Sequence, residues 1–258
     1  MLTIKNLTKI FHKGTVNQRI ALDQIDLTAE SGDFITIIGS NGAGKSTLMN
    51  CISGVERADG GSIVLDGEDI TRLPEYKRSR MIGRVFQDPM KGTAFDMTIE
   101  QNLAIAGCKQ KRHGLQPGIS KKERDFFRER LALLGMGLED RMTQKVKLLS
   151  GGQRQALTLF MAVLAEPRLL LLDEHTAALD PATAKKVLEL TDEFAAKDRL
   201  CTLMITHNMA DALAHGNRTI LMDSGKIMMD IAGDERRSLT VEGLIEKFEI
   251  ANDRMLLQ

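Results

Sequence analysis

A nine-residue, glycine-rich stretch constrains this chain more than any other feature. It is Gly39-Ser40-Asn41-Gly42-Ala43-Gly44-Lys45-Ser46-Thr47, which matches G-x-x-x-x-G-K-[ST] without a gap. The apolar, β-branched run 34–38 before it predicts a buried strand, and the apolar residues within 48–52 predict a helix that closes at Gly54. A strand, a glycine loop and a helix are the setting in which this motif binds phosphate.

The chemistry of such a loop depends on its backbone and on two side chains. Glycines allow backbone N–H groups to turn toward phosphate oxygens, and the N-terminus of the following helix adds positive dipole. Lys45 can reach the β- and γ-phosphates of a nucleotide, and the Ser46 hydroxyl is a candidate ligand of Mg²⁺. A glycine-rich turn with a chance lysine is the alternative, which the flanking strand and helix disfavour.

Composition and segment character narrow the class of protein. The 258 residues contain 35 Lys+Arg and 35 Asp+Glu, so no overall basic charge favours nucleic acid as a partner. The three cysteines, Cys51, Cys108 and Cys201, form no C-x-x-C pair, which indicates buried free thiols in a reducing compartment. Because the sequence shows no signal-peptide core and no apolar stretch long enough to span a bilayer, we expect a soluble cytoplasmic protein whose membrane role comes through a partner.

The order of predicted elements indicates an α/β protein. Apolar and alternating runs predict strands at 2–7, 20–28, 61–67, 82–86, 169–172, 201–206, 218–223 and 226–231, the last two as a hairpin. From about residue 98 to 164 the periodicity is helical, with capping boxes starting at Thr98 and Ser120. A closing helix is predicted at 238–248. We therefore expect a parallel-sheet α/β core that carries a helical subdomain.

Two adjacent carboxylates end the apolar strand predicted at 169–172. Asp173 is a candidate Mg²⁺ ligand together with Ser46, directly or through water. Glu174 is a candidate to orient or deprotonate an attacking water. A strand that simply ends at polar residues is the alternative, but four leucines before two acids, downstream of a phosphate loop, favour the nucleotide site.

An ordered set of motifs resembles the ATP-binding-cassette (ABC) ATPases over nearly the whole chain. After the phosphate loop come Gln87, the run Leu149-Ser150-Gly151-Gly152-Gln153, Asp173-Glu174, Asp180 and His207. The resemblance implies a P-loop NTPase fold of class α/β, with a RecA-like parallel-sheet core, an N-terminal antiparallel β subdomain and a helical signature subdomain. It implies one ABC ATPase domain over 1–258, with the core and β subdomain at 1–87 and 166–258 and the helical subdomain at about 88–165.

The resemblance also implies roles for individual residues. Glu174 would be the catalytic base, His207 the histidine that contacts the γ-phosphate, and Gln87 the loop glutamine that joins nucleotide state to the helical subdomain. Gln87 would also ligate Mg²⁺, beside Ser46 and Asp173. The cofactors implied are ATP and Mg²⁺.

Nucleotide contacts are implied for the phosphate loop, for the signature run and for two further residues. Phe11, in a predicted polar loop, would stack on adenine, where the family usually has tyrosine. The N-terminus of the signature helix would bind the γ-phosphate held on a partner subunit, and Asp180 would contact that partner. The implied residues are Phe11, Gly39, Ser40, Asn41, Gly42, Ala43, Gly44, Lys45, Ser46, Thr47, Ser150, Gly151, Gly152, Gln153 and Asp180.

Segments 173–181 and 207–213 resemble one bacterial subgroup of uptake type, some of whose systems are linked to tryptophan or tyrosine. This implies three partners: an integral-membrane permease, a second ABC ATPase subunit that is identical or homologous, and an extracytoplasmic substrate-binding protein. The expected location is the cytoplasmic face of the membrane, and no nucleic acid is expected. Apolar residues of 95–99 and Leu103 either contact the permease or form core of the helical subdomain.

Three other functions compete with this interpretation. An ABC ATPase of an export or lipoprotein-release system would carry the same motifs. A non-transport ABC protein typically has long coiled-coil inserts or two cassettes, and this sequence shows neither. A GTPase usually carries Asn-Lys-x-Asp after a strand, whereas Asn208-Met209-Ala210-Asp211 lacks the lysine, so ATP is favoured.

Overall fold

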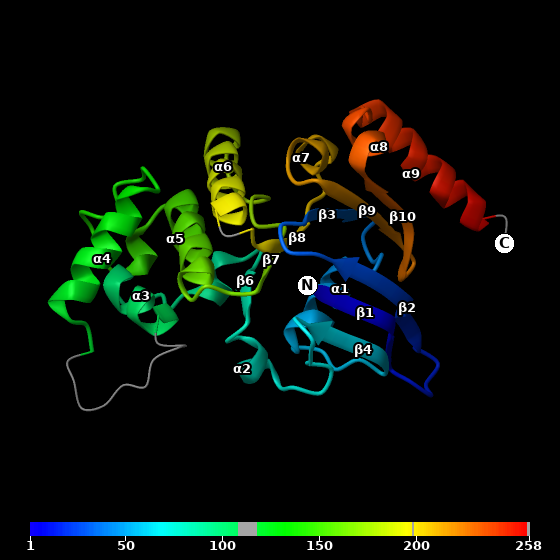
Figure 1. Cartoon of the computed structure of the whole chain (residues 1–258), viewed down its shortest axis with the longest axis horizontal. Coiled ribbons are helices and arrows are strands. Elements are labelled where there is room, and N and C mark those ends of the chain that lie inside the picture. The colour runs from blue at the N-terminus through cyan, green and yellow to red at the C-terminus, as the bar shows by residue number, and fades with distance from the viewer. Residues whose placement is uncertain (108–117, 198, 257–258) are drawn as a thin grey trace. The chain divides into compact units, whose positions relative to one another are not determined.

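The computed structural model describes residues 1–107, 118–197 and 199–256, which fall into two compact units (Figure 1). Unit 1 is Met1–Ser79 with Ala195–Gln258, and unit 2 is Arg80–Phe194. The segment at about 88–165, for which the sequence predicts a helical subdomain, belongs to unit 2. Cys108, for which the sequence predicts a free thiol, lies outside the described residues. No helix within these ranges is long and apolar enough to span a bilayer.

One sheet of unit 1 is antiparallel, with strand order β2-β1-β4-β5. Its strands are β1 (Leu2–Phe11), β2 (Arg19–Ala29), β4 (Gly60–Leu65) and β5 (Glu68–Asp69). The placement of Phe11 in a loop is wrong: Phe11 is the last residue of β1 and pairs with Arg19 of β2. The reason is cross-strand pairing, which extends β1 past the point where its own apolar alternation ends.

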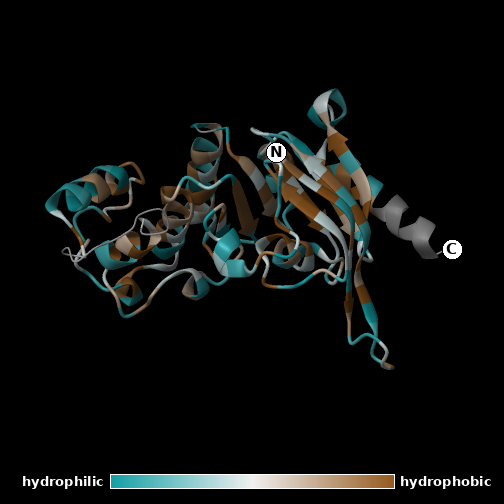
Figure 2. Cartoon of the chain, turned by 60° about the horizontal axis from the view of Figure 1, so that its bottom comes forward, coloured by the Kyte–Doolittle hydropathy of each residue, from teal (hydrophilic) through white to brown (hydrophobic). Residues whose placement is uncertain are grey.

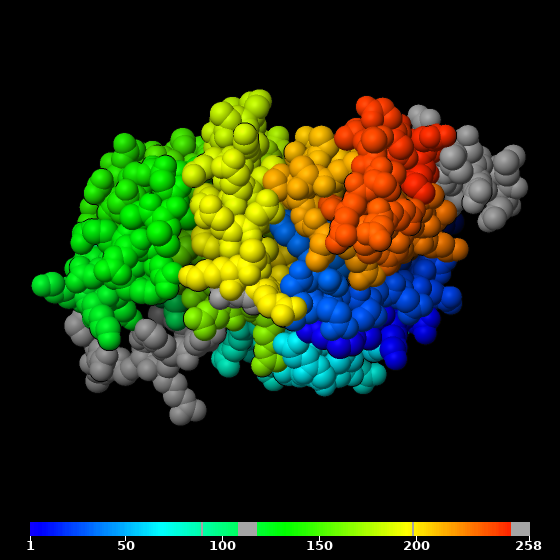
Figure 3. Space-filling model, turned by 45° about the horizontal axis from the view of Figure 1, so that its top comes forward, coloured from blue at the N-terminus to red at the C-terminus, as the bar shows by residue number. Residues whose placement is uncertain are grey.

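The other strands of unit 1 lie in the order β10-β9-β3-β8. They are β3 (Phe34–Gly39), β8 (Cys201–Ile205), β9 (Arg218–Asp223) and β10 (Lys226–Ala232). Strand β3 runs parallel to β8 and β9, and β9 and β10 form the predicted antiparallel hairpin. All five residues of β8 are buried, as parallel strands covered on both faces require. Figure 2 shows brown, the hydrophobic end of the scale, concentrated in the strands. Strand β10 also contacts β2, and Figure 3 shows the orange and red C-terminal residues lying against the blue N-terminal ones.

The helices of unit 1 are α1 (Lys45–Ser53), α2 (Glu75–Arg78), α7 (Met209–Ala214), α8 (Gly233–Arg237) and α9 (Val241–Leu256). Helix α1 closes at Gly54, as predicted, with φ 87° at that residue. The closing helix predicted at 238–248 is α9, which begins at Val241 and runs to Leu256, and the short helix α8 precedes it. Cys51 and Cys201 are buried free thiols, and burial raises their pKa values to about 11 and about 12.

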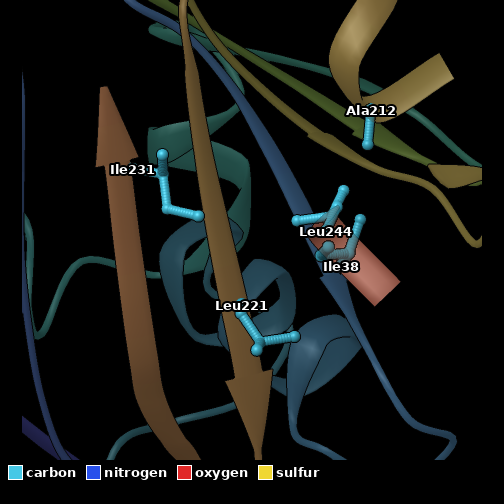
Figure 4. Packing of buried hydrophobic residues seen from close by; sticks show 5 residues of the cluster. All are labelled: Ile38, Ala212, Leu221, Ile231 and Leu244. Atoms are coloured by element: carbon cyan, nitrogen blue, oxygen red, sulfur yellow. The ribbon is translucent and has the colours of Figure 1, made fainter. Parts of the chain in front are cut away.

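A cluster of buried residues joins β3, α7, β9, β10 and α9 (Figure 4). Its members are Ile38, Ala212, Leu221, Ile231 and Leu244, none more than 3% exposed. Full burial of one such aliphatic side chain contributes about 1.5–3 kcal/mol before entropy is counted. The cluster therefore anchors β3 directly before the phosphate loop, and α7 directly after His207.

Unit 2 combines a pair of parallel strands with helices. The strands are β6 (Ile82–Val85) and β7 (Leu169–Asp173). The helices are the 3₁₀ turns η1 (Pro89–Gly92) and η3 (Val146–Leu148), with α3 (Ile99–Gly107), α4 (Lys121–Ala132), α5 (Gly151–Leu164) and α6 (Pro181–Lys197). Both predicted capping boxes are confirmed: Ser120 and Glu123 cap α4 reciprocally, and Thr98 and Gln101 do so at α3. The predicted α/β class is confirmed.

Candidate functional site

The phosphate loop connects the end of β3 to the start of α1, as the sequence predicts. A Cβ atom at Gly39 would lie 2.0 Å from the Met222 carbonyl oxygen, and one at Gly44 would lie 2.5 Å from the Ala21 carbonyl oxygen. Both glycines also have positive φ, 153° and 100°. A side chain at either position is therefore excluded by contact and by conformation, which explains why glycine is required there.

Lys45 lies over this loop. Its ammonium group donates hydrogen bonds to the carbonyl oxygens of Gly39 (2.8 Å) and Ser40 (2.9 Å), and the residue is 7% exposed. Asn41, Gly42 and Ser46 are exposed. A buried cation beside exposed backbone and an exposed hydroxyl forms a cradle that fits anionic phosphate oxygens.

The turn between β9 and β10 supports the loop from a second side. The Ser40 hydroxyl donates to Asp223 Oδ1 (2.7 Å), and the Gly225 N–H donates to the Ala43 carbonyl (3.0 Å). Ser224 donates to the other oxygen of Asp223, which is 8% exposed. Sequence reasoning missed Asp223. The sequence signal that could have identified Asp223 is an acidic residue at the end of a predicted apolar strand.

His207 follows β8 at the sheet edge where the phosphate loop follows β3. The two strands are parallel neighbours, so residues after their carboxyl ends meet at one edge. The Thr206 N–H donates to the Ile37 carbonyl (3.2 Å), so the pairing of β8 with β3 continues to the residue before His207. The His207 side chain is exposed. Asn208 caps α7 by accepting hydrogen bonds from the N–H groups of Ala210 and Asp211.

Phe11 is half-buried at the end of β1. Lys9 Nζ lies 5.0 Å from the centroid of its ring, a cation–π distance. Lys9 is itself held by Glu56 (3.2 Å) and by the Arg57 carbonyl. Stacking of a base on Phe11 would therefore use the face of the ring away from Lys9.

Unit 2 brings together the carboxylates of β7 and residues at the end of β6. Gln87 Nε2 donates to Glu174 Oε2 (3.1 Å), and Arg84 Nη2 lies 3.5 Å from Asp173 Oδ2. Glu174 has φ 45°, the left-handed conformation that non-glycine residues adopt rarely and mostly in turns or at functional sites. Arg84 was not identified from the sequence, because its approach to Asp173 depends on the pairing of β6 with β7.

The signature run begins helix α5 with a complete capping box. The Ser150 hydroxyl accepts from the Gln153 N–H, and the Gln153 side chain accepts from the Ser150 N–H, both at 3.2 Å. Ser150 and Gly151 are exposed, whereas Gly152 is buried, and a Cβ atom there would lie 2.0 Å from Thr183 Cγ2. An exposed helix N-terminus of this kind attracts anions.

Asp180 is the N-cap of α6, and Pro181 is the first helical residue, as predicted. Its carboxylate accepts a hydrogen bond from the Thr183 N–H (3.1 Å), and the hydrogen bonds of Thr183 lower the pKa of Asp180. Because Thr183 also contacts Gly152, the N-termini of α5 and α6 lie together in unit 2.

The apolar residues that the sequence suggests as permease contacts fall into two groups. Ile99 and Leu103 are fully buried, so they are core of unit 2 and the contact interpretation is wrong for them. Met97 is 36% exposed, and the Phe95 ring packs 4.5 Å from the Arg154 guanidinium.

Each unit carries oxygen donors of the kind that bind a hard cation. Hydroxyl, carboxylate and amide oxygens on Ser46, Asp173 and Gln87 are the ligand types that Mg²⁺ prefers. Among the described residues no group of three His, Cys, Asp or Glu could hold a metal alone. A cation shared with nucleotide phosphates does not need such a group, because the phosphates complete its coordination.

Comparison with known proteins identifies relatives over most of the chain. The family described as "ABC transporter" matches residues 22–177. The tyrosine transport ATP-binding protein of Clostridioides difficile is 45% identical over 97% of this chain and 100% of its own length. The methionine import ATP-binding protein MetN of Rhizobium johnstonii is 39% identical, and the match spans 81% of this chain but 56% of that protein. A dimeric post-hydrolysis structure of the ATP-binding cassette MJ0796, bound to ADP and Pi, superposes with a TM-score of 0.76 at 26% identity, covering 90% of this chain and 98% of that one.

Proposed function

This chain belongs to the ABC transporter family, as an ATP-hydrolysing subunit that drives transport through a permease, and we propose that its system imports an aromatic amino acid. The observation that carries the proposal is the 45% identity with a tyrosine transport ATP-binding protein over 97% of this chain and all of that protein. The resemblance of segments 173–181 and 207–213 to a tryptophan/tyrosine-type subgroup supports it.

In the proposed site, the loop amides and Lys45 bind the β- and γ-phosphates. Ser46, Asp173 and Gln87 would hold Mg²⁺, which when bound would supply positive charge to neutralise the phosphates. Glu174 accepts the proton of the attacking water as general base. The hydrogen bond from Gln87 supports this role, since it fixes the orientation of the Glu174 carboxylate. His207 donates to the γ-phosphate.

The remaining site residues act between two copies. Ser150, Gly151, Gly152 and Gln153 present a helix N-terminus to the γ-phosphate held by a partner subunit, and Asp180 contacts the same partner. The contact of Gly152 with Thr183 supports a shared surface, because it holds these residues together. The dimeric cassette bound to ADP and Pi offers a structural precedent.

We also propose the partners and location that follow from an uptake system. The chain would dock on an integral-membrane permease at the cytoplasmic face of the membrane, and an extracytoplasmic binding protein would deliver the substrate. The region 88–165 would be the helical subdomain, and 1–87 with 166–258 the core and β subdomain.

The test is reconstitution of this chain with the permease that co-purifies with it. The two proteins are co-expressed, purified together and placed in liposomes with the associated binding protein. We expect tyrosine or tryptophan to stimulate ATP hydrolysis and to accumulate inside, and methionine and alanine to do neither. Stimulation of ATP hydrolysis by methionine alone would rule out an aromatic substrate. Efflux of the substrate would rule out import.

A further inference from the structure

Arg19 connects the start of β2 to the middle of the phosphate loop. It lies opposite Phe11 in the antiparallel pairing of β1 and β2. Its Nη2 donates a hydrogen bond to the Gly42 carbonyl oxygen (2.9 Å). A Cβ atom on residue 42 would lie 2.7 Å from the same nitrogen, so glycine permits this close approach. One side chain thus spans the distance from the strand pair that carries Phe11 to the loop that binds phosphate.

The charge of Arg19 is not neutralised locally. The residue is exposed, and within the described ranges no carboxylate comes within ion-pair distance of its guanidinium group. Other basic residues of unit 1 differ: Lys9 pairs with Glu56 (3.2 Å), and Lys226 pairs with Asp23 (3.2 Å). A cation without an acidic partner, held against a phosphate loop, raises the local affinity for anionic ligands.

The donor geometry of arginine suits this position. A guanidinium group has five N–H donors in a planar fork, and the Gly42 carbonyl accepts from one nitrogen. The remaining donors can bind phosphate oxygens without breaking the bond to Gly42. Lysine would supply the charge but not the fork.

We propose that Arg19 is a further nucleotide-binding residue, which donates charge-assisted hydrogen bonds to the phosphate chain. This rests on the proposed roles of the phosphate loop and of Phe11 as the adenine contact. Because Arg19 lies opposite Phe11, it reaches the phosphates nearer the base, which ATP and ADP share. Arg19 therefore strengthens the binding of both nucleotides.

The test measures nucleotide binding directly, by calorimetry on the full chain with ATP and with ADP. Arg19→Met keeps the length of the side chain and removes its charge, and we expect both nucleotides to bind about tenfold more weakly. Arg19→Lys should lose about threefold, because a point charge remains. The affinity of Arg19→Met should also fall less steeply with added salt.

Lys13→Met is the matched control, since Lys13 is an exposed cation in the loop between β1 and β2. It should bind as the unaltered chain does. Equal affinities for Arg19→Met and the unaltered chain would overturn the proposal, as would equal losses in Lys13→Met. A loss of affinity confined to ATP would overturn the placement of Arg19 at the phosphates nearer the base. An unaltered chain that binds neither nucleotide would instead contradict the proposed function.

Discussion

In the proposed site, Lys45 places its positive charge directly against the nucleotide phosphates. Its ammonium group is held by two loop carbonyls and is 7% exposed, so its loss leaves a cationic position empty. Lys45→Ala should weaken ATP binding at least about tenfold and abolish hydrolysis, since hydrogen bonds to charged groups are worth about 1.5–3 kcal/mol. Calorimetry and phosphate release measure the two effects. Lys5→Ala, an exposed lysine of β1, is the control. Near-normal binding by Lys45→Ala would contradict the assignment.

Asp223 acts one residue further from the nucleotide, through Ser40. Asp223→Ala removes the acceptor of the 2.7 Å hydrogen bond and should raise the KM for ATP about three- to tenfold with a smaller effect on kcat. Asp223→Asn retains an acceptor oxygen, so it should restore most of the difference. Ser224→Ala is the control, because it removes a bond to Asp223 but leaves the bond from Ser40. If the Asn variant were as impaired as the Ala variant, the hydrogen bond would not be the cause.

These residues show which parts of the site could be predicted from the sequence. The phosphate loop, Asp173-Glu174 and the signature run are each one contiguous stretch of sequence. Their chemistry can therefore be predicted from spacing alone. The pairing of Ser40 with Asp223 joins residues 183 positions apart. It depends on β9 lying beside β3, a neighbour relation that local pattern does not contain. The approach of Arg84 to Asp173 has the same origin.

At the scale of elements, α8 contributes a clamp on α7. Arg236 donates to the carbonyl oxygens of Ala212 (2.9 Å) and His215 (2.6 Å), and to the Thr219 hydroxyl (2.9 Å). These carbonyls belong to the C-terminal end of α7, where a cation is favourable. Desolvation lowers the pKa of Arg236, which is partly buried.

Arg236→Met should therefore destabilise unit 1, since the carbonyls of Ala212, Leu213 and His215 and the Thr219 hydroxyl each lose one hydrogen-bond donor. We expect the free energy of unfolding to fall by about 1–3 kcal/mol. Urea denaturation followed by circular dichroism measures the change. Arg237→Met is a close control: the neighbouring arginine is exposed and pairs with Asp234, three residues away. Equal stability of the two variants would show that the clamp contributes little.

Elements whose ends depend on pairing were the least predictable from the sequence. Strand β1 continues to Phe11 because β2 offers it partners, although its alternation has ended. Helix α8 was missed because a five-residue helix carries too short a periodic pattern to detect. In contrast, the end of α1 and the starts of α4 and α6 were predicted. The residues that set them, Gly54, Ser120 and Asp180, each act on the neighbouring backbone.

At the scale of the whole molecule, the proposed mechanism requires two cassettes. Ser150 and Gly151 are exposed at the N-terminus of α5, and the proposed roles place them on the γ-phosphate of a partner's nucleotide. The triphosphate is then part of the interface, through charge-assisted hydrogen bonds. Cleavage removes that bridge, so the pair should open after hydrolysis and transmit the motion to the permease.

Glu174→Gln tests this mechanism, because it separates binding from hydrolysis. Glutamine retains an oxygen that accepts the hydrogen bond from Gln87, but it is not a base, so hydrolysis should slow by about 10²–10⁴. With ATP and Mg²⁺ the variant should sediment as a dimer, and without nucleotide as a monomer. Adding Ser150→Arg should abolish the dimer, since a bulky cation then occupies the N-cap position that the proposed mechanism places against the partner's γ-phosphate. Adding Lys13→Met, an exposed change in the β1–β2 loop, should leave the dimer intact. A Glu174→Gln protein that stays monomeric at saturating ATP, both alone and with its permease, would rule out the paired mechanism for this chain.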